Sequence, residues 1–441
     1  MKLYESIGIG VPEVLLPREG VDLHRWAAIA CDQYTSQPEY WAEAATLVGD
    51  APSTLKMIFP EVFLSESDPD ARIAAIGAEM QRYLDEGVLE PRDGFVYVRR
   101  RVGDTVRHGL LVCIDLEAYD YNQGSSSLVR ATEGTILSRL PPRVKVREGA
   151  PVELPHIMVL IDDPEDSVIG AVAARQPELQ KLYDFELMLG GGALEGYGVD
   201  AAGEASVVAA LGALADPEAF ARRYDVEASA RPLLFAMGDG NHSLATAKAI
   251  WEKAKKESNP APDDPRRHAL VELVNLHDAA MVFEPIHRVV FDVAEGVDIA
   301  AELRAHFGDR AKSETVADVD AMIAAVEAST AEVQRFGFLT ESTLEVIEVR
   351  DADSNLPVGS LKGFLDPFME AQKAHEVDYV HGTAALTDLG RKPRNAGFFL
   401  PGMDKNDLFK TVIVDGALPR KTFSMGEADE KRFYMECRRI K

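Results

Sequence analysis

Hydrophobic residues recur along the chain with spacings that suit both helices and strands. Across residues 70–89 they return every three or four positions, which predicts a helix that Asp70 caps. Two apolar runs, 95–98 and 109–114, flank the turn residues Gly103-Asp104 and predict a pair of strands. The helical and strand patterns interleave without a regular βαβ period, so the sequence predicts a mixed α/β (α+β) fold.

The middle of the chain carries two further apolar runs. Residues 156–161 and 233–237 each predict a buried strand, and the second leads into a helix. Arg143, Lys145 and Arg147 alternate with other residues, so on a strand they would share one face. A solvated basic edge explains the same alternation.

Loops and the grouping of motifs divide the chain into three expected regions. These are an N-terminal α/β region (1–125), a core (126–295) and a C-terminal α+β region (296–441). The glycine-rich stretch 190–198 is compatible with a lid over a site or with a plain flexible loop. Residues 411–414 are an expected strand.

Composition and charge exclude several classes of function. Lys and Arg total 47 against 73 Asp and Glu, giving a net charge of −26, which repels nucleic-acid phosphates. No apolar run is long enough to cross a bilayer, so no membrane partner is expected. Three scattered cysteines argue against a disulfide framework or a cysteine zinc site. Together with a start that lacks a secretory signal, they predict a reduced, cytoplasmic protein.

The common nucleotide and metal motifs are absent from the sequence. The run Gly190 to Gly196 has Glu195 where the dinucleotide fingerprint needs glycine. There is no Gly-x-x-x-x-Gly-Lys-Ser/Thr loop and no His-Glu-x-x-His pair. Any nucleotide site must therefore use another geometry.

A strand, a glycine turn and a helix follow one another around Asp239. Gly238 and Gly240 flank this aspartate, and residues 241–243 then open the helix. The first N–H groups of a helix are unpaired and its dipole is positive there, so the turn can bind an anion. Asp239 could hold a phosphate-bound Mg²⁺. An ordinary capped turn has the same composition.

The segment Gly238-Asp239-Gly240-Asn241-His242-Ser243 resembles the Asp-Gly-His-His-Arg signature of the ParB/sulfiredoxin-like fold. Free L-serine kinases of that fold carry the signature at a phosphate-binding helix start. Most of the chain is similar to a bacterial and archaeal family, domain-of-unknown-function family one thousand and fifteen. The blocks that carry this likeness are 29–38, 130–135, 285–288 and 418–425. The resemblance implies a ParB/sulfiredoxin-like core with additional N- and C-terminal α/β elements.

The resemblance carries over only some residues of the motif. Asp239 and His242 match its aspartate and its second histidine, which implies that both lie by the phosphates. Asn241 replaces the first histidine and Ser243 replaces the arginine. Because that arginine is a bidentate phosphate clamp, another cation must take its place or the donor must be held differently.

Other cations and carboxylates complete the predicted site. Arg130, Glu133 and Thr135 offer a phosphate partner, a general base for the acceptor hydroxyl and a hydroxyl group. Glu133 could equally be a capping or surface residue. Arg143, Lys145 and Arg147 are candidates for the missing motif arginine. The expected substrate-binding residues, for which internal ion pairs are the alternative, are His287, Arg288, Arg420 and Lys421.

These observations predict a kinase-like phosphotransferase. The expected reaction moves a phosphoryl group from ATP, ADP or pyrophosphate to the hydroxyl of a small amino or hydroxy acid. L-serine is the first candidate for this acceptor. Asp239, Glu133 and His242 are its expected catalytic residues, with Mg²⁺ on Asp239. Gly238, Gly240, Asn241 and Ser243 are expected to bind the donor. The alternative is a regulator that binds a nucleotide or phosphorylated metabolite at the same turn without turnover.

Overall fold

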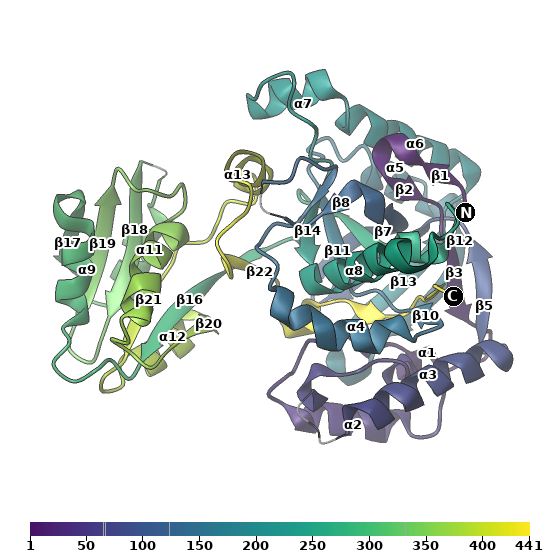
Figure 1. Ribbon diagram of the computed structural model, residues 1–441, viewed down its shortest axis with the longest axis horizontal. Helices are drawn as coiled ribbons and strands as arrows, with labels where there is room; N and C mark the ends of the chain where they lie inside the picture. Colours follow the sequence, from purple (N-terminus) through teal and green to yellow (C-terminus); the bar gives the residue numbers. More distant parts are fainter. Residues whose placement is uncertain (65, 67, 123, 331) are drawn as a thin grey trace. The chain divides into compact units, whose positions relative to one another are not determined.

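The computed structural model describes residues 1–441 apart from 65, 67, 123 and 331. The chain divides into two compact units (Figure 1). Unit 1 contains residues 1–282 and 426–441, and unit 2 contains residues 283–425. Residues 426–441 rejoin unit 1 after the whole of unit 2, and we call them the return segment.

Unit 1 is built on a mixed sheet that has eleven strands among the described residues. The hairpin of β6 and β7 confirms the strand pair expected around Gly103-Asp104. Strand β11 runs parallel to β15 and antiparallel to β14, which is parallel to β9. The main path follows the order β12 (Gln180–Glu186), β13 (Ala193–Gly198), β6 (Val96–Val102), β7 (Thr105–Asp115), β15 (His268–Asn275), β11 (Met158–Ile161), β14 (Phe235–Asp239), β9 (Val129–Arg130) and β8 (Tyr119–Asp120). Strands β2 (Ile9–Gly10) and β1 (Leu3–Tyr4) extend it from β7.

Both faces of this sheet are buried, as the alternation of side chains along β7 shows. Leu110, Val112 and Ile114 belong to one apolar cluster, whereas Leu111 and Cys113 belong to another. Successive side chains of a strand point to opposite faces, so β7 separates two cores.

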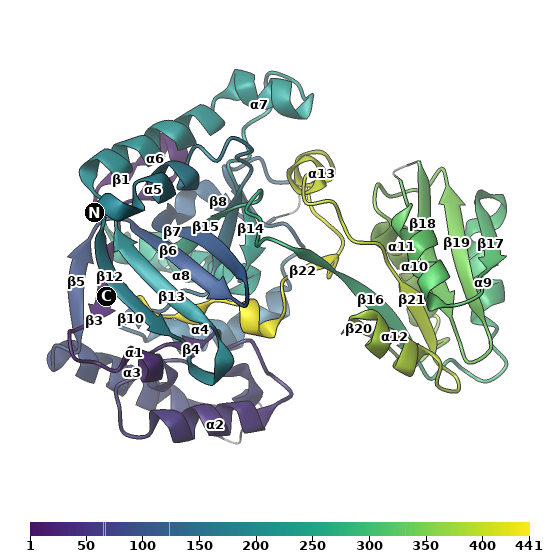
Figure 2. The same cartoon turned by 180° about the vertical axis from the view of Figure 1, so that it is seen from behind.

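Helices cover the two faces, and α8 lies alongside α4 (Figure 1). Helices α5 and α6 lie next to each other (Figure 2) and share one apolar cluster with α8, whereas α2 and α3 belong to the cluster on the other face. The helices of unit 1 are α1 (Leu23–Trp26), α2 (Pro38–Val48), α3 (Pro69–Asp85), α4 (Leu140–Glu148), α5 (Ile169–Ala174), α6 (Ala201–Leu214), α7 (Pro217–Tyr224) and α8 (Asn241–Ser258). Strands β3 (Glu13–Pro17) and β5 (Leu89–Asp93) form a separate pair.

The return segment is built into unit 1. Its strand β23 (Phe433–Tyr434) pairs with β4 (Ala28–Ile29), and β24 (Arg438–Arg439) pairs with β10 (Val152–Glu153). The buried indole of Trp26 donates a 3.0 Å hydrogen bond to the carbonyl of Met435. The core of unit 1 therefore depends on residues that lie far apart in the chain.

Unit 2 has its own seven-stranded sheet among the described residues. The order is β17 (Ala311–Thr315), β19 (Leu344–Arg350), β18 (Val333–Leu339), β21 (Ala396–Phe399), β16 (Phe283–Phe291) and β20 (Glu376–His381), with β22 (Phe423–Met425) also on β16. Its helices are α9 (Ile299–Phe307), α10 (Val319–Glu327), α11 (Pro357–Glu370), α12 (Thr383–Gly390) and α13 (Asp407–Asp415). Apolar side chains fill both faces of this sheet as well.

The fold differs from the sequence expectations at several points. The helix expected to start at Asp70 begins at Pro69, and Asp68 is the residue that caps it, by accepting from the N–H of Ala71. Residues 411–414 are helical in α13, so the expected strand is wrong. The bounds of the two units differ from the three expected regions because strands on both sides of residue 125, such as β7 and β15, pair in one sheet.

The basic alternation at residues 143–147 is also helical rather than extended. Pro141 and Pro142 open α4, and proline is favoured in the first turn of a helix, where its missing N–H has no partner to lose. In the stretch 190–198, residues 193–198 form β13 inside the sheet. Gly196 allows this packing, because a Cβ there would lie 2.1 Å from the Tyr183 ring. Across the described residues, no helix combines the length and the apolar character needed to span a membrane.

Candidate phosphate-binding site

The turn between β14 and α8 brings backbone N–H groups and a carboxylate together. Gly240 is the N-cap of α8, with a φ of +80° that glycine adopts without strain. A Cβ at this position would lie 3.0 Å from the Cα of Ile157, so the close approach also requires glycine. In the described part of the chain, no side chain caps α8. Its first N–H groups and the positive end of its dipole can therefore serve an anion.

Lys431 brings a positive charge to this turn from the return segment. Its Nζ lies 3.2 Å from Oδ2 of Asp239, and the residue is only 8% exposed. Oδ1 of Asp239 accepts a 2.8 Å hydrogen bond from the N–H of Gly240. Burial acts to raise the pKa of Asp239, but the charges of Lys431 and His156 and the Gly240 hydrogen bond hold it below its usual range. Asp239 is therefore ionised at neutral pH and fixes Lys431 next to the helix start.

His156 links the start of α8 to the return segment. Its Nε2 lies 3.0 Å from Oγ of Ser243, and its Nδ1 lies 2.6 Å from the hydroxyl of Tyr434. That hydroxyl also lies 3.2 Å from Sγ of Cys31, and burial raises the pKa of both the tyrosine and the thiol. Asp32 approaches His156 Nε2 at 3.8 Å. The imidazole thus holds Ser243 in a fixed orientation at the first turn of α8.

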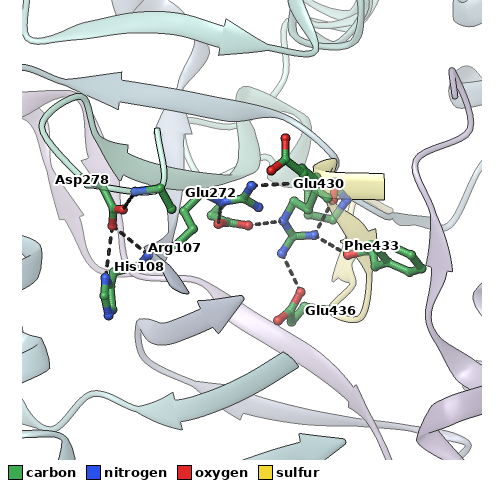
Figure 3. A network of polar contacts seen from close by, with 10 residues as sticks. Arg107, His108, Glu272, Asp278, Glu430, Phe433 and Glu436 are labelled. Carbon is green, nitrogen blue, oxygen red and sulfur yellow. Dashed lines mark hydrogen bonds and ion pairs between the residues drawn. The ribbon is translucent and has the colours of Figure 1, made fainter. Parts of the chain in front are cut away.

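A buried network of ion pairs anchors the return segment (Figure 3). Arg432 donates to Glu272 of β15 at 2.7 Å and to Glu436 at 2.6 Å, and none of these three side chains is more than 4% exposed. Nε of Arg107 lies 3.5 Å from the other Glu272 oxygen. A Cβ at Gly109 would lie 2.5 Å from that oxygen, so glycine leaves room for the carboxylate. Removing one partner of such a buried pair costs about 3–5 kcal/mol, because it leaves an uncompensated buried charge, so unit 1 requires the return segment to neutralise these carboxylates.

A cavity of about 140 Å³ opens next to the first turn of α8. His156, Ser243 and Tyr434 form one part of its lining. Most of the remaining wall is apolar and includes Met57 and Val146. The cavity therefore places an apolar space next to the polar groups of the helix start.

Glu133, the predicted base, follows a residue that is tied to β14. Thr132 donates a 2.8 Å hydrogen bond to the carbonyl of Met237, which brings the next residue to the strand end that leads into Asp239. Arg130 donates to the carbonyls of Ser127 and Arg231, each at 2.8 Å, and burial lowers its pKa.

Thr135 and Asn241 both have a buried oxygen without a hydrogen-bond partner among the described residues. Buried polar atoms of this kind are rare in native structures. Both residues therefore keep hydrogen-bonding capacity that a ligand could use.

The three cations of α4 differ in their surroundings. Lys145 pairs with Asp70, and both side chains are more than half exposed. Arg147 pairs with Glu153 and Arg143 pairs with Glu61, and both arginines line the cavity. Each of the three is therefore paired with a carboxylate of unit 1.

The predicted substrate-binding residues all lie in unit 2. Arg288 is 5% exposed and donates to the carbonyls of Ile286, Arg420 and Lys421. His287 is buried, and its Nδ1 accepts from the N–H of Leu400. Its pKa is lowered to about 4, first by burial and then by the neighbouring charges. The structure thus ties Arg288 to the main chain of Arg420 and Lys421, whereas His287, the preceding residue of the same strand, contacts Leu400 and the Phe399 ring.

Asp239 does not fit the role of a direct Mg²⁺ ligand. Lys431 lies 3.2 Å from its Oδ2, so an ammonium group occupies the place of a cation beside the carboxylate. No cluster of three or more His, Cys, Asp or Glu side chains suited to a metal is found among the residues described. Magnesium often binds chiefly through substrate phosphates and water, and that mode leaves Asp239 with Lys431.

Sequence reasoning missed His156, Lys431 and Tyr434. His156 is the first residue of an expected strand, Tyr434 lies in residues 433–437, which were expected only to form a strand, and Lys431 precedes that strand. No local pattern marks them, because each acquires its role through contacts with residues far away in the chain. The loss of the motif arginine at Ser243 was the one signal that another cation had to be present.

Three solved structures illustrate what the chain is similar to. A conserved hypothetical protein from Pyrococcus furiosus shares 10% identity, with 74% of this chain and 90% of that chain covered and a TM-score of 0.34. A variant of free serine kinase in complex with ADP shares 10% identity, with coverage of 78% and 95% and a TM-score of 0.39. SbnI with a C-terminal truncation, from Staphylococcus aureus, shares 9% identity, with coverage of 71% and 81% and a TM-score of 0.35.

The sequence itself matches one family model. No curated protein matches the chain. The model described as "Protein of unknown function (DUF1015)" matches residues 15–368, which is well over half of the sequence. This is the family that the sequence blocks resembled, and the chain is a member of it.

Proposed function

We propose that this protein is a phosphotransferase that moves a phosphoryl group from a nucleotide or pyrophosphate to the hydroxyl of a small amino or hydroxy acid. The observation that carries the proposal is the Lys431–Asp239 pair at the uncapped start of α8. A fixed cation beside the uncapped start of a helix is an arrangement that stabilises a phosphoryl group in transfer.

In this proposal the donor phosphates lie against the first N–H groups of α8. Lys431 supplies the positive charge that the motif loses where Ser243 stands in place of arginine. Asp239 keeps Lys431 in position and remains charged, and Gly238 and Gly240 allow the phosphates to approach the backbone. His242, in the first turn, contributes to neutralising the charge.

Glu133 is the proposed base for the acceptor. It takes the proton of the acceptor hydroxyl as the oxygen attacks phosphorus and a new O–P bond forms. The bond from phosphorus to the bridging oxygen of the donor breaks at the same time, and the leaving phosphate keeps the electron pair. Positioning and charge neutralisation supply most of the rate enhancement in such reactions. No step passes through a metal on Asp239.

The test is ³¹P NMR of the purified protein with L-serine in a magnesium-containing buffer. ATP, ADP and pyrophosphate are offered in separate tubes, together with a tube that contains no protein. A phosphoserine resonance in any protein tube supports the reaction and identifies the donor.

Two negative outcomes have different meanings. If no phosphorylated product appears but a donor raises the melting temperature, the protein binds this donor and either senses it or uses an acceptor other than L-serine. If the donors neither react nor change the melting temperature, the turn at Asp239 is not a phosphate site and the proposal fails.

A further inference from the structure

The residues that line the cavity next to Ser243 indicate which kind of ligand it can hold. Its apolar wall comes from a segment that follows α2, from α3, from α4 and from the residues around β10. These wall residues are Met57, Ile58, Phe59, Met80, Pro142, Val146, Val152 and Leu154. Protein interiors contain few voids larger than a water molecule, and 140 Å³ has room for roughly ten water-sized groups. A space of this size and character suits an apolar group.

The charged residues deep in the cavity are already paired within the protein. Glu153 accepts from Arg147, from Arg438 at 2.5 Å and from the N–H of Leu270 at 2.9 Å. The hydroxyl of Thr246 donates to a main-chain carbonyl at 2.7 Å. A ligand therefore does not need to supply charges or hydrogen bonds to satisfy these groups.

Two polar places in the lining remain suited to a ligand. The first is Oγ of Ser243, which His156 orients and which can both donate and accept hydrogen bonds. The second is the pair of Arg143 and Glu61, whose side chains are about one-fifth exposed. Leu64, also in the lining, is 39% exposed and marks the solvent side. Arg143 donates to Glu61 and to the main-chain carbonyl of Arg139. A guanidinium has five N–H donors, so Arg143 can also bind a ligand carboxylate at this place.

We propose that this cavity is the acceptor subsite and that the acceptor is a hydroxy acid with an aliphatic or aromatic body. This inference rests on the phosphotransferase function proposed above. The acceptor hydroxyl lies at Ser243 and the start of α8, the apolar body lies against the wall of Met57, Phe59 and Val146, and the carboxylate meets Arg143. A ligand such as L-serine leaves the apolar wall uncovered and loses its own hydration beside it, so it binds less tightly.

The experiment compares lactate with 3-phenyllactate by isothermal titration calorimetry on the full-length protein. The two probes share the hydroxyl and the carboxylate, and they differ only in the phenyl group. The expected result is a dissociation constant at least tenfold lower for 3-phenyllactate. Equal binding of the two, or no binding of either, overturns the proposal.

Variants locate the binding in the cavity. Val146→Trp fills the space and is expected to abolish 3-phenyllactate binding, while Glu148→Trp on the exposed side of α4 leaves it unchanged. Because a large side chain at Val146 can impair folding, Leu64→Asp at the exposed rim is the second variant. It is expected to weaken 3-phenyllactate binding about tenfold with an unchanged melting temperature. Unchanged binding in a folded Val146→Trp or Leu64→Asp protein overturns the location.

The two proposals fail in distinguishable ways. Binding of 3-phenyllactate in the cavity without phosphoryl transfer from any donor refutes the phosphotransferase function and leaves a hydroxy-acid site. Transfer to L-serine, combined with equal binding of lactate and 3-phenyllactate, refutes only the apolar acceptor. With all donors, the preferred acceptor among lactate, L-serine and 3-phenyllactate is expected to be 3-phenyllactate.

Discussion

The two regions that the sequence suggested as anion sites, the turn at Asp239 in unit 1 and the basic residues around Arg288 in unit 2, are built in different ways. In unit 1, Lys431 faces the carboxylate of Asp239 at the uncapped start of a helix. In unit 2, Arg288 donates to three main-chain carbonyls, and its guanidinium lies 4.7 Å from the centre of the Tyr379 ring. Both regions contain buried cations, but only the first is combined with backbone N–H groups that an anion can use.

The comparison shows that a buried cation indicates a binding site only when its partners leave part of it for a ligand. Carbonyl groups that bind an arginine stabilise the loops that carry them, and here these are the loop residues Arg420 and Lys421. Lys431 instead lies 3.2 Å from a carboxylate at the start of a helix, where backbone N–H groups and the helix dipole also favour an anion. The role of Arg288, His287 and the loop in substrate binding stays a prediction.

The largest expected effect is that of Asp239→Asn. The change removes the charge that fixes Lys431, so phosphoryl transfer is expected to fall about 10²- to 10³-fold. The measurement is turnover by ³¹P NMR, with circular dichroism to check the fold. Asp104→Asn, in an exposed turn, is the matched control. Wild-type turnover in a folded Asp239→Asn protein would remove the site from the reaction.

Lowering the pH is expected to destabilise unit 2, because His287 is held in its neutral form in the folded protein. Its folded pKa of about 4 lies below the ordinary 6.5 because the ring is buried and close to Arg288. Below pH 6.5 the unfolded chain binds a proton that the folded chain refuses, so stability is lost as the pH falls from 6.5 to 4. This loss amounts to about 3 kcal/mol.

Hydrogen exchange measures this pH dependence directly. The N–H of Leu400 donates to Nδ1 of His287 at 3.1 Å, so its protection reports on the ring. Protection is expected to decrease between pH 6.5 and 4 in the wild-type protein and to change less in His287→Gln. The same decrease in both proteins would show that other groups determine the acid response.

Lys431→Met is expected to have a smaller effect, and it tests whether this lysine contacts the phosphates of the donor. Loss of one charge-assisted contact is expected to raise the dissociation constant of the donor about tenfold. Lys431→Arg retains the charge and is expected to recover most of the affinity. The measurement is calorimetric titration with ATP. An unchanged affinity in Lys431→Met would mean that the donor phosphates lie away from this side chain.

The smallest effect is expected for Lys145→Ala. This lysine forms an exposed ion pair with Asp70, and such pairs contribute about 0–1 kcal/mol to stability. Affinity for ATP and the melting temperature are both expected to stay close to those of the wild-type protein. A marked loss of ATP affinity would indicate that Lys145 contacts the donor phosphates, and it would argue against Lys431 as the cation that replaces the motif arginine.

Local patterns predicted part of the fold well. The hairpin of β6 and β7 and the passage from β14 into α8 follow from apolar runs and glycine turns, because neighbouring residues determine them. The alternation of basic residues at 143–147 suggested a strand, but these residues are helical because two prolines favour the start of a short helix there. A ParB/sulfiredoxin-like core stays a prediction.

The sequence predicted only the part of the site that is formed by residues close together in the chain. Asp239 and the first turn of α8 could be found because the strand, turn and helix are continuous in sequence. Lys431 and Tyr434 could not, because the contacts that give them a role bridge the whole of unit 2. Long-range pairing of this kind has no period and no spacing that one sequence displays.

The return segment also determines when the site can exist during synthesis. A ribosome must translate all of unit 2, for roughly 10 to 30 s, between residue 282 and the first residue of the return segment. In that interval Glu272 lacks Arg432 and Asp239 lacks Lys431, and β4 and β10 lack the strands that pair with them. The proposed phosphate site therefore reaches its finished geometry only after unit 2 has been made.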